Sequence, residues 1–236
     1  MSENLIKSND RVKQHGEVFT PNKIVNKMLN QPEIQENIKS LTSTFLEPAA
    51  GEGAFLIEIL RRKLKVALKN SKTLKDFGES SLLALSSLYG IELLEDNIEM
   101  LVMNMLSEFN NAYLSAVMQF EGTVNKHVLE SAKIIIRANM VQGDTLKRIN
   151  SQGQPIVFSE WKLLPLKRGV RKVQRTEFTL DSIIEGGEAV ETSVPQHVEE
   201  FDLFADSFEN ESAKTKLVKY VPVRITEVYK QLVEAI

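Results

Sequence analysis

The chain has 236 residues, of which 42% are apolar, and this is enough to bury the core of one large domain. Its 29 basic and 32 acidic residues nearly cancel, which excludes a generally polybasic coat for nucleic acid but allows a local basic face. Cysteine is absent, which excludes a disulfide scaffold, a thiolate metal site and a cysteine nucleophile. We find no secretion signal and no apolar run that could span a bilayer, so we expect a cytoplasmic protein.

Residues 1–152 predict an α/β domain, because helical and strand patterns alternate along them. Thr20 and Pro21 suit the start of a helix, with Thr20 as the N-cap and Pro21 at the first helical position. The pattern then predicts a strand at 44–49, a helix over 55–68, a polar stretch over 69–80, a strand at 88–93, a helix over 98–120, a helix over 124–137 and a third strand at 140–143.

Residues 153–182 predict a basic β-hairpin that completes or flanks the sheet, with strands at 155–164 and 170–180. Its cations, opposed only by Glu160 between residues 159 and 175, are Lys162, Lys167, Arg168, Arg171, Lys172 and Arg175. This pattern is compatible with weak, salt-sensitive DNA binding through Lys167, Arg168, Arg171 and Lys172. An edge strand protected by its own charges explains the pattern at least as well.

Residues 183–211 predict an acidic linker, since the longer stretch 176–211 holds eleven acidic residues and no Lys or Arg. The composition favours a solvated, partly disordered segment. The alternative is an acidic arm that covers the basic hairpin or mimics a nucleic-acid backbone. Residues 212–236 form a basic C-terminal segment, with a helix predicted over 226–235.

The most informative segment runs from Phe45 to Leu56, where a strand enters a glycine-rich turn and then a helix. Gly51 and Gly53 let the backbone turn sharply and approach a ligand, and the helix start offers unpaired N–H groups. This pattern is typical of a nucleotide cofactor site at the carboxyl end of a sheet, although a tight turn without a ligand would look similar. Leu56 stands where the dinucleotide fingerprint has its third glycine, and Glu47 would repel a pyrophosphate. A carboxylate suits the ammonium and sulfonium groups of S-adenosylmethionine instead.

Two further carboxylates end the next two predicted strands. Glu92 ends the strand at 88–93, where a carboxylate can accept hydrogen bonds from both hydroxyls of a ribose. Asp144 ends the third strand and can accept from an adenine amine, although such a residue is more often a helix cap. His15, His127 and His197 lack ligand spacing, so we expect no metal site.

Taken in chain order, four segments resemble motifs of the S-adenosylmethionine-dependent, adenine-specific DNA methyltransferases, the modification subunits of restriction systems. Residues 16–21 resemble their N-terminal cofactor element, and residues 47–56, 89–93 and 139–144 resemble three successive motifs, with Ala50 where Cys is frequent. The resemblance covers roughly residues 11–150. It implies a Rossmann-like methyltransferase domain with an N-terminal helical element.

The resemblance also implies the residues that bind S-adenosylmethionine. Phe19, Thr20 and Pro21 would hold its methionine end, a loop around Glu47, Gly51 and Gly53 would surround it, Glu92 would bind the ribose, and Asp144 would bind the adenine amine. The full implied set is Phe19, Thr20, Pro21, Glu47, Pro48, Ala49, Gly51, Gly53, Glu92, Leu93 and Asp144.

The family's catalytic motif, Asn or Asp followed by two prolines and an aromatic residue, is missing, since none of the seven prolines is adjacent to another. Glu160 and Trp161 stand at the expected place. They are either a divergent pair that accepts the amine hydrogens and stacks on a flipped base, or, as the pattern favours, part of an ordinary strand with Trp161 in the core.

Three functions fit the sequence. The first is an adenine-specific DNA methyltransferase of a restriction-modification or phage-type system, which transfers a methyl group to the exocyclic amine of adenine. The second is a non-catalytic S-adenosylmethionine-binding subunit of a modification complex, and the third is a methyltransferase for another substrate. The expected partners are DNA, bound weakly by this chain alone, and a protein that supplies target recognition or the missing motif. No membrane partner is expected.

Overall fold

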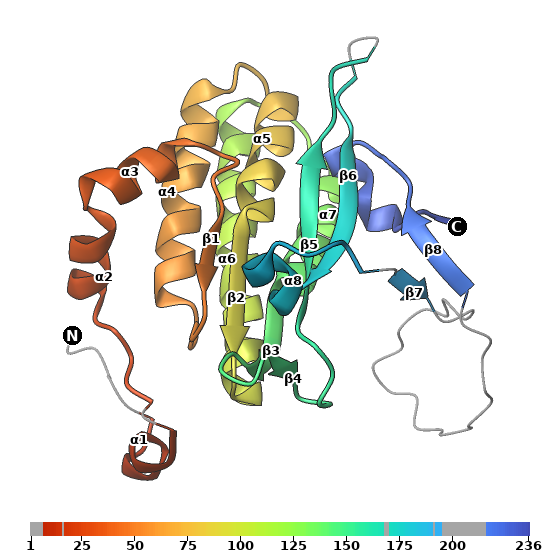
Figure 1. Ribbon diagram of the computed structural model, residues 1–236. Helices are drawn as coiled ribbons and strands as arrows, with labels where there is room; N and C mark the ends of the chain where they lie inside the picture. Colours follow the sequence, from red (N-terminus) through yellow and green to blue (C-terminus); the bar gives the residue numbers. More distant parts are fainter. Residues whose placement is uncertain (1–6, 16, 168–169, 191, 195–215) are drawn as a thin grey trace, which may run out of the picture.

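The computed structural model describes residues 7–15, 17–167, 170–190, 192–194 and 216–236 (Figure 1). Its central sheet has the order β1-β2-β3-β4, formed by β1 (Phe45–Glu47), β2 (Leu88–Glu92), β3 (Met140–Asp144) and β4 (Ile149–Asn150). Strands β1, β2 and β3 are parallel, and the short β4 pairs antiparallel with β3. The fold is therefore a mixed α/β arrangement with a mostly parallel sheet, as the alternating sequence pattern predicted.

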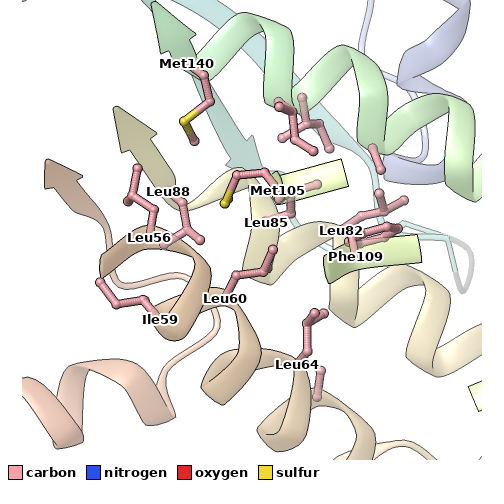
Figure 2. Close-up of a cluster of buried hydrophobic side chains, with 14 of the residues drawn as sticks. Leu56, Ile59, Leu60, Leu64, Leu82, Leu85, Leu88, Met105, Phe109 and Met140 are labelled. Carbon is pink, nitrogen blue, oxygen red and sulfur yellow. The ribbon is translucent and has the colours of Figure 1, made fainter. Parts of the chain in front are cut away.

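Four long helices pack against one face of this sheet. They are α4 (Ala54–Asn70), α5 (Leu74–Ser86), α6 (Glu95–Gln119) and α7 (Lys126–Asn139). Figure 2 shows the buried side chains of this layer, in which Leu56 and Leu60 of α4 lie near Leu88 of β2 and Met105 of α6. Successive side chains alternate between the two faces of a strand, so Leu88 faces these helices while Ile91 faces away from them.

The opposite face of the sheet is partly covered by the strand pair β5 (Val157–Leu163) and β6 (Val173–Thr179) and by α8 (Leu180–Glu185). Ile91 packs there with Ile156, Phe158 and Leu180. The hydroxyl of Tyr89 donates to the Ser159 carbonyl over 3.1 Å, which fixes β5 to the sheet.

Trp161 lies on the side of β5 that faces α7. Its side chain is 7% exposed, and its indole N–H donates to Oδ1 of Asn139 over 3.2 Å. Trp161 is therefore a core residue of the strand pair, as the sequence pattern favoured.

Three short helices precede β1, namely α1 (Asn9–His15), α2 (Asn22–Leu29) and α3 (Pro32–Lys39). The N-cap of α2 is Pro21, and its carbonyl accepts the N–H groups of Ile24 and Val25. The prediction that Thr20 is the N-cap is wrong by one residue, because the helix starts after the proline and has no side-chain cap.

Two segments differ from their predicted secondary structure. The polar stretch over 69–80 contains the start of α5, whose capping box joins Thr73 and Asp76. The helix predicted over 226–235 is instead the 3-10 helix η1 (Ile225–Lys230) followed by β9 (Val233–Ala235), which pairs with β8 (Lys216–Tyr220). Gln231, with φ of 45°, ends η1 and turns the chain into β9.

The predicted acidic linker is described only in part. Its first residues end α8, and β7 (Thr192–Val194) pairs antiparallel with β8. Residues 195–211 of the linker, like Gly16 and Arg168, lie outside the described residues.

The far end of the β5–β6 pair lies at the opposite end of the molecule from the carboxyl ends of β1, β2 and β3 (Figure 1). The described cations near it are exposed: Lys162, Lys167, Arg171 and Lys172. Arg175 differs, because its guanidinium lies over the rings of Trp161 and Tyr220 and pairs with Glu177 over 3.0 Å. Arg175 therefore contributes to packing and is not one of the exposed cations of the β5–β6 pair. Among the described helices, none is both long and apolar enough to cross a membrane.

Candidate functional site

The loop between β1 and α4 is shaped by two glycines with left-handed backbone conformations, Gly51 (φ 54°) and Gly53 (φ 97°). Gly53 is the N-cap of α4, and a Cβ there would come within 2.4 Å of Cδ1 of Leu101. A Cβ on Gly51 would point at the ring of Phe19 from 3.9 Å. Both glycines thus allow the backbone conformation of the loop, and Gly53 in addition leaves no room for a side chain unless Leu101 shifts.

Two adjoining cavities lie around this loop at the carboxyl ends of the strands. The first, of about 390 Å³, lies between the loop, the end of β2 and the turn after β3. The second, of about 360 Å³, lies between the loop and the start of α2. Val18, Phe19, Ala49 and Gly51 line both cavities, so the two adjoin and together make up the candidate site.

Most of the predicted site residues meet in these cavities. Pro48, Glu92, Leu93 and Asp144 line the first, Thr20 and Glu47 line the second, and Phe19, Ala49 and Gly51 line both. Pro21 and Gly53 line neither cavity. They act on the site through the backbone, since each caps the helix that follows it.

Glu92 is buried, and its carboxylate fixes the loop from the neighbouring strand. Oε2 accepts the N–H of Gly51 over 2.8 Å, and Oε1 accepts the N–H of Leu94 over 3.0 Å and the amide of Asn97 over 3.3 Å. A carboxylate has about four acceptor positions, so these three bonds leave roughly one for a ligand. Glu92 therefore positions the loop, and the remaining acceptor position on Oε2 leaves the predicted contact with a ribose hydroxyl open.

Asp144 caps the turn that follows β3. Its Oδ1 accepts the N–H groups of Leu146 and Lys147 over 3.0 and 3.1 Å, and its Oδ2 pairs with Nζ of Lys147 over 3.0 Å. The Lys147 N–H and ammonium hold the pKa of this carboxyl below its usual value. Thr145 ties the same turn to the loop by donating to the Pro48 carbonyl over 2.6 Å. Asp144 stays ionised, and Oδ2 retains room to accept from a ligand amine.

The lining of the site combines acidic and apolar groups. Burial raises the pKa of Glu47, although the N–H of Ala49 opposes the shift. Val18, Leu93 and Leu146 are 58%, 50% and 95% exposed at its walls. A flat apolar ring that carries or adjoins a positive charge fits such a lining, because exposed aliphatic groups gain from contact with the ring and carboxylates attract the charge.

Sequence reasoning missed a polar network beside the site. Glu17 lines the first cavity and pairs with Arg11 of α1. Its Oε1 also accepts the amide of Asn97 over 2.6 Å. Arg11 additionally bonds both carboxylate oxygens of Asp96 over 2.9 and 3.0 Å. The only local signal was Glu17 within the segment 16–21, since its partners stand in other parts of the sequence.

Glu160 and Trp161 do not join the site. Glu160 lines a different, largely apolar cavity of about 320 Å³, together with Phe45, Leu46, Tyr89 and Phe158. Burial, and secondarily the charge of Glu160, raises the pKa of Tyr89 to about 12. The buried Trp161 has no free face for a base. Within the described part of the chain, no group of three His, Asp or Glu side chains could hold a metal ion.

A family model described as N-6 DNA methylase matches residues 1–140. This range contains the loop, both glycines, Glu17 and Glu92, and ends just before the turn that holds Asp144. Neither the curated proteins nor the solved structures gave a match to the chain.

Proposed function

Because this chain belongs to the N-6 DNA methylase family, we propose that it binds S-adenosylmethionine in the two adjoining cavities around Gly51. The observation that carries the proposal is the convergence of Phe19, Glu47, Gly51 and Asp144, distant in sequence, on two adjoining cavities at the carboxyl ends of parallel strands.

The residues present fit this cofactor. The carboxylate of Glu47 offers negative charge for its ammonium and sulfonium groups, and Leu93 and Leu146 offer apolar contact for its adenine. The free position on Oδ2 of Asp144 can accept the adenine amine. When bound, the cofactor supplies an electrophilic methyl group. The chain's own residues, which line the two cavities, would position it.

The test is calorimetry with S-adenosylmethionine. Asp144→Asn removes the charge and one acceptor, and we expect the affinity to fall about five- to 150-fold, which corresponds to roughly 1–3 kcal/mol. Lys147→Met is the matched control, because it removes the ion partner of Asp144 but leaves the acceptor available. Folded wild-type chain that binds no S-adenosylmethionine would end the proposal.

The substrate that this family membership supports is adenine in DNA, and we assign the chain to a modification system. Methyl transfer forms a bond from the exocyclic nitrogen to the methyl carbon, breaks the methyl–sulfur bond and releases one proton from the amine. The amine is a weak nucleophile, so acceptors for its hydrogens are needed. Among the residues that line the two cavities, no Asn or Asp is followed by two prolines, and Trp161 is buried elsewhere.

A second candidate is a cofactor-binding subunit that is completed by a partner chain. Strand β1 ends the order of the central sheet, and the N–H of Phe45 points inward to the Ser87 carbonyl. The backbone groups of Leu46 therefore point to the outer edge, where no described strand pairs with them. A parallel strand from a partner added at this edge would end beside Glu47, next to the proposed cofactor site.

A further inference from the structure

We propose that Arg11 is a positioning residue for the cofactor site, and that it clamps the segment 17–20 over the loop without touching the cofactor. The inference rests on the proposed binding of S-adenosylmethionine. Arg11 lines neither cavity, whereas Glu17, Val18 and Phe19, which follow it along the chain, line the first.

The clamp is a continuous series of contacts from α1 to the glycine loop. The guanidinium of Arg11 bonds both carboxylate oxygens of Glu17 on one side and those of Asp96 on the other. Glu17 then accepts the amide of Asn97, and Asn97 donates to Glu92, whose other oxygen holds the N–H of Gly51. The positions of α1, the start of α6 and the loop are thus mutually fixed.

A second cation strengthens the same connection. Nζ of Lys7 pairs with Glu52 of the loop over 2.8 Å and with Asp96 over 3.0 Å, and donates to Oδ1 of Asn97 over 2.7 Å. Its ammonium also lies 5.8 Å from the centre of the Phe19 ring. Lys7 and Arg11 together connect the chain before α2 to Glu52 in the loop and to Asp96 in the first turn of α6.

The Arg11–Glu17 pair is largely protected from solvent, whereas the Arg11–Asp96 pair is more exposed. The side chain of Glu17 is 8% exposed and that of Arg11 is 26% exposed, but that of Asp96 is 49% exposed. Hydrogen bonds from Arg11 hold the pKa of Glu17 below its usual value and lower that of Asp96 to about 2. Both carboxylates therefore stay ionised above pH 5. Salt should weaken the exposed Arg11–Asp96 pair more than the Arg11–Glu17 pair.

The clamp matters for binding because the segment 17–20 forms a wall of the cavity. If that wall is ordered in only a fraction of molecules, the apparent dissociation constant rises by the inverse of that fraction. Without Arg11, Glu17 keeps the hydrogen bond from Asn97 and the weaker attraction of Lys7 but loses its forked ion pair, so the ordered fraction falls and the cofactor binds more weakly.

The experiment measures S-adenosylmethionine affinity by calorimetry for wild type and Arg11→Met. We expect about tenfold weaker binding, and an intermediate value for Arg11→Lys, which keeps the charge but loses the forked contact. Lys39→Met is the control, since Lys39 makes an exposed pair with Glu36 on α3, away from the site. Backbone nitrogen NMR relaxation should show greater motion at Val18, Phe19 and Thr20 but not within α4.

A double variant separates the clamp from independent contacts. If Arg11 acts through Glu17, Arg11→Met with Glu17→Gln should bind no more weakly than the worse single variant; multiplied losses would contradict the inference. Wild-type affinity in Arg11→Met, or backbone motion that increases equally throughout the chain, would overturn it. If wild-type chain binds no cofactor, the proposed function fails, and the backbone motion of residues 18–20 in Arg11→Met still decides whether the clamp exists.

Discussion

Lys63 of α4 is a buried cation that joins three segments at the amino ends of β1 and β2. Its side chain is fully buried, and Nζ donates to the carbonyls of Ser40 and Ser43 over 3.0 and 2.6 Å and to Oγ of Ser87 over 2.7 Å. Three acceptors favour the ammonium, which also lies 5.1 Å from the ring centre of Phe45. Burial nevertheless lowers its pKa to about 7.

This pKa predicts a pH-dependent stability. The unfolded chain, with a lysine pKa near 10.5, binds more protons than the folded chain between about pH 7 and pH 10.5, so stability rises with pH in that window. The rise is at most about 1.4 kcal/mol per pH unit. Between pH 7.5 and 9.5 the free energy of unfolding of wild type should increase by about 2 kcal/mol more than that of Lys63→Met.

Urea denaturation at the two pH values measures the difference. Equal pH dependence in both proteins would contradict the prediction. Should Lys63→Met fail to fold, direct titration of the Lys63 ammonium in wild type by nitrogen NMR gives the same answer, and a midpoint near 10.5 would refute it.

At the scale of elements, α5 shows how local polar contacts start a helix inside a stretch that looks like a loop. The hydroxyl of Thr73 accepts the N–H of Asp76 over 3.1 Å, while Oδ2 of Asp76 accepts the N–H of Thr73 over 3.0 Å. The Thr73 hydroxyl and nearby backbone N–H groups hold the pKa of Asp76 below its usual value. The helix then buries Phe77, Leu82 and Leu85 against α4 and α7.

Thr73→Ala removes this cap and should lower the free energy of unfolding by about 1 kcal/mol, because the N–H of Asp76 at the helix start loses its acceptor. Thermal denaturation at neutral pH measures the loss. Thr123→Ala, at an exposed threonine before α7, is the control and should change stability by much less. A Thr73→Ala variant as stable as this control would show that packing alone holds α5 in place.

The elements that the sequence predicted well are those with long apolar periodicity. The helices around Leu56, Met105 and Ile135 and the three parallel strands follow directly from spacing. The threonine and acid three residues apart at 73–76 were a readable signal for α5 that the polar composition obscured. By contrast, β9 depends on pairing with β8 and Gln231 on a left-handed turn, and no local pattern specifies either.

The candidate site also combines residues that the sequence predicted and residues that it did not. Its glycine loop, Glu92 and Asp144 each follow a strand, so their meeting at one edge of a parallel sheet was predictable. The pairing of Arg11 with Asp96 and of Glu17 with Asn97 joins residues about 80 positions apart, and charge alone does not select one partner among 32 acidic residues.

At the scale of the whole molecule, the acidic end and the exposed cations of the β5–β6 pair are far apart. Glu17, Glu47, Glu52 and Asp144 border the cavities, and the exposed cations of the β5–β6 pair lie at the other end (Figure 1). DNA phosphates are attracted by cations. The exposed cations of the β5–β6 pair are therefore too far away to hold a duplex at the cavities, where Lys147 beside Asp144 is the nearer exposed cation.

We expect purified chain to transfer methyl groups to DNA slowly or not at all, and transfer to accelerate when the product of a neighbouring gene that carries the missing motif is added. Holding the reactants close still allows a trace rate. A radiolabelled methyl-transfer assay on mixed-sequence DNA measures both conditions, with Asp144→Asn as the variant that should lose the accelerated rate. Fast turnover by the purified chain, lost in Glu160→Gln, would show that Glu160 belongs to a disguised catalytic pair.

The buried amide of Asn139 couples the family-matched region to the rest of the chain. Its nitrogen donates to the carbonyls of Ser86 and Leu88 over 3.3 and 3.2 Å, and its oxygen accepts only when Trp161 has docked. A chain cut at residue 140, where the family match ends, would leave that oxygen without its indole donor and would uncover Ile91. The end of the family match is thus not a folding boundary, and both parts should melt in a single cooperative transition.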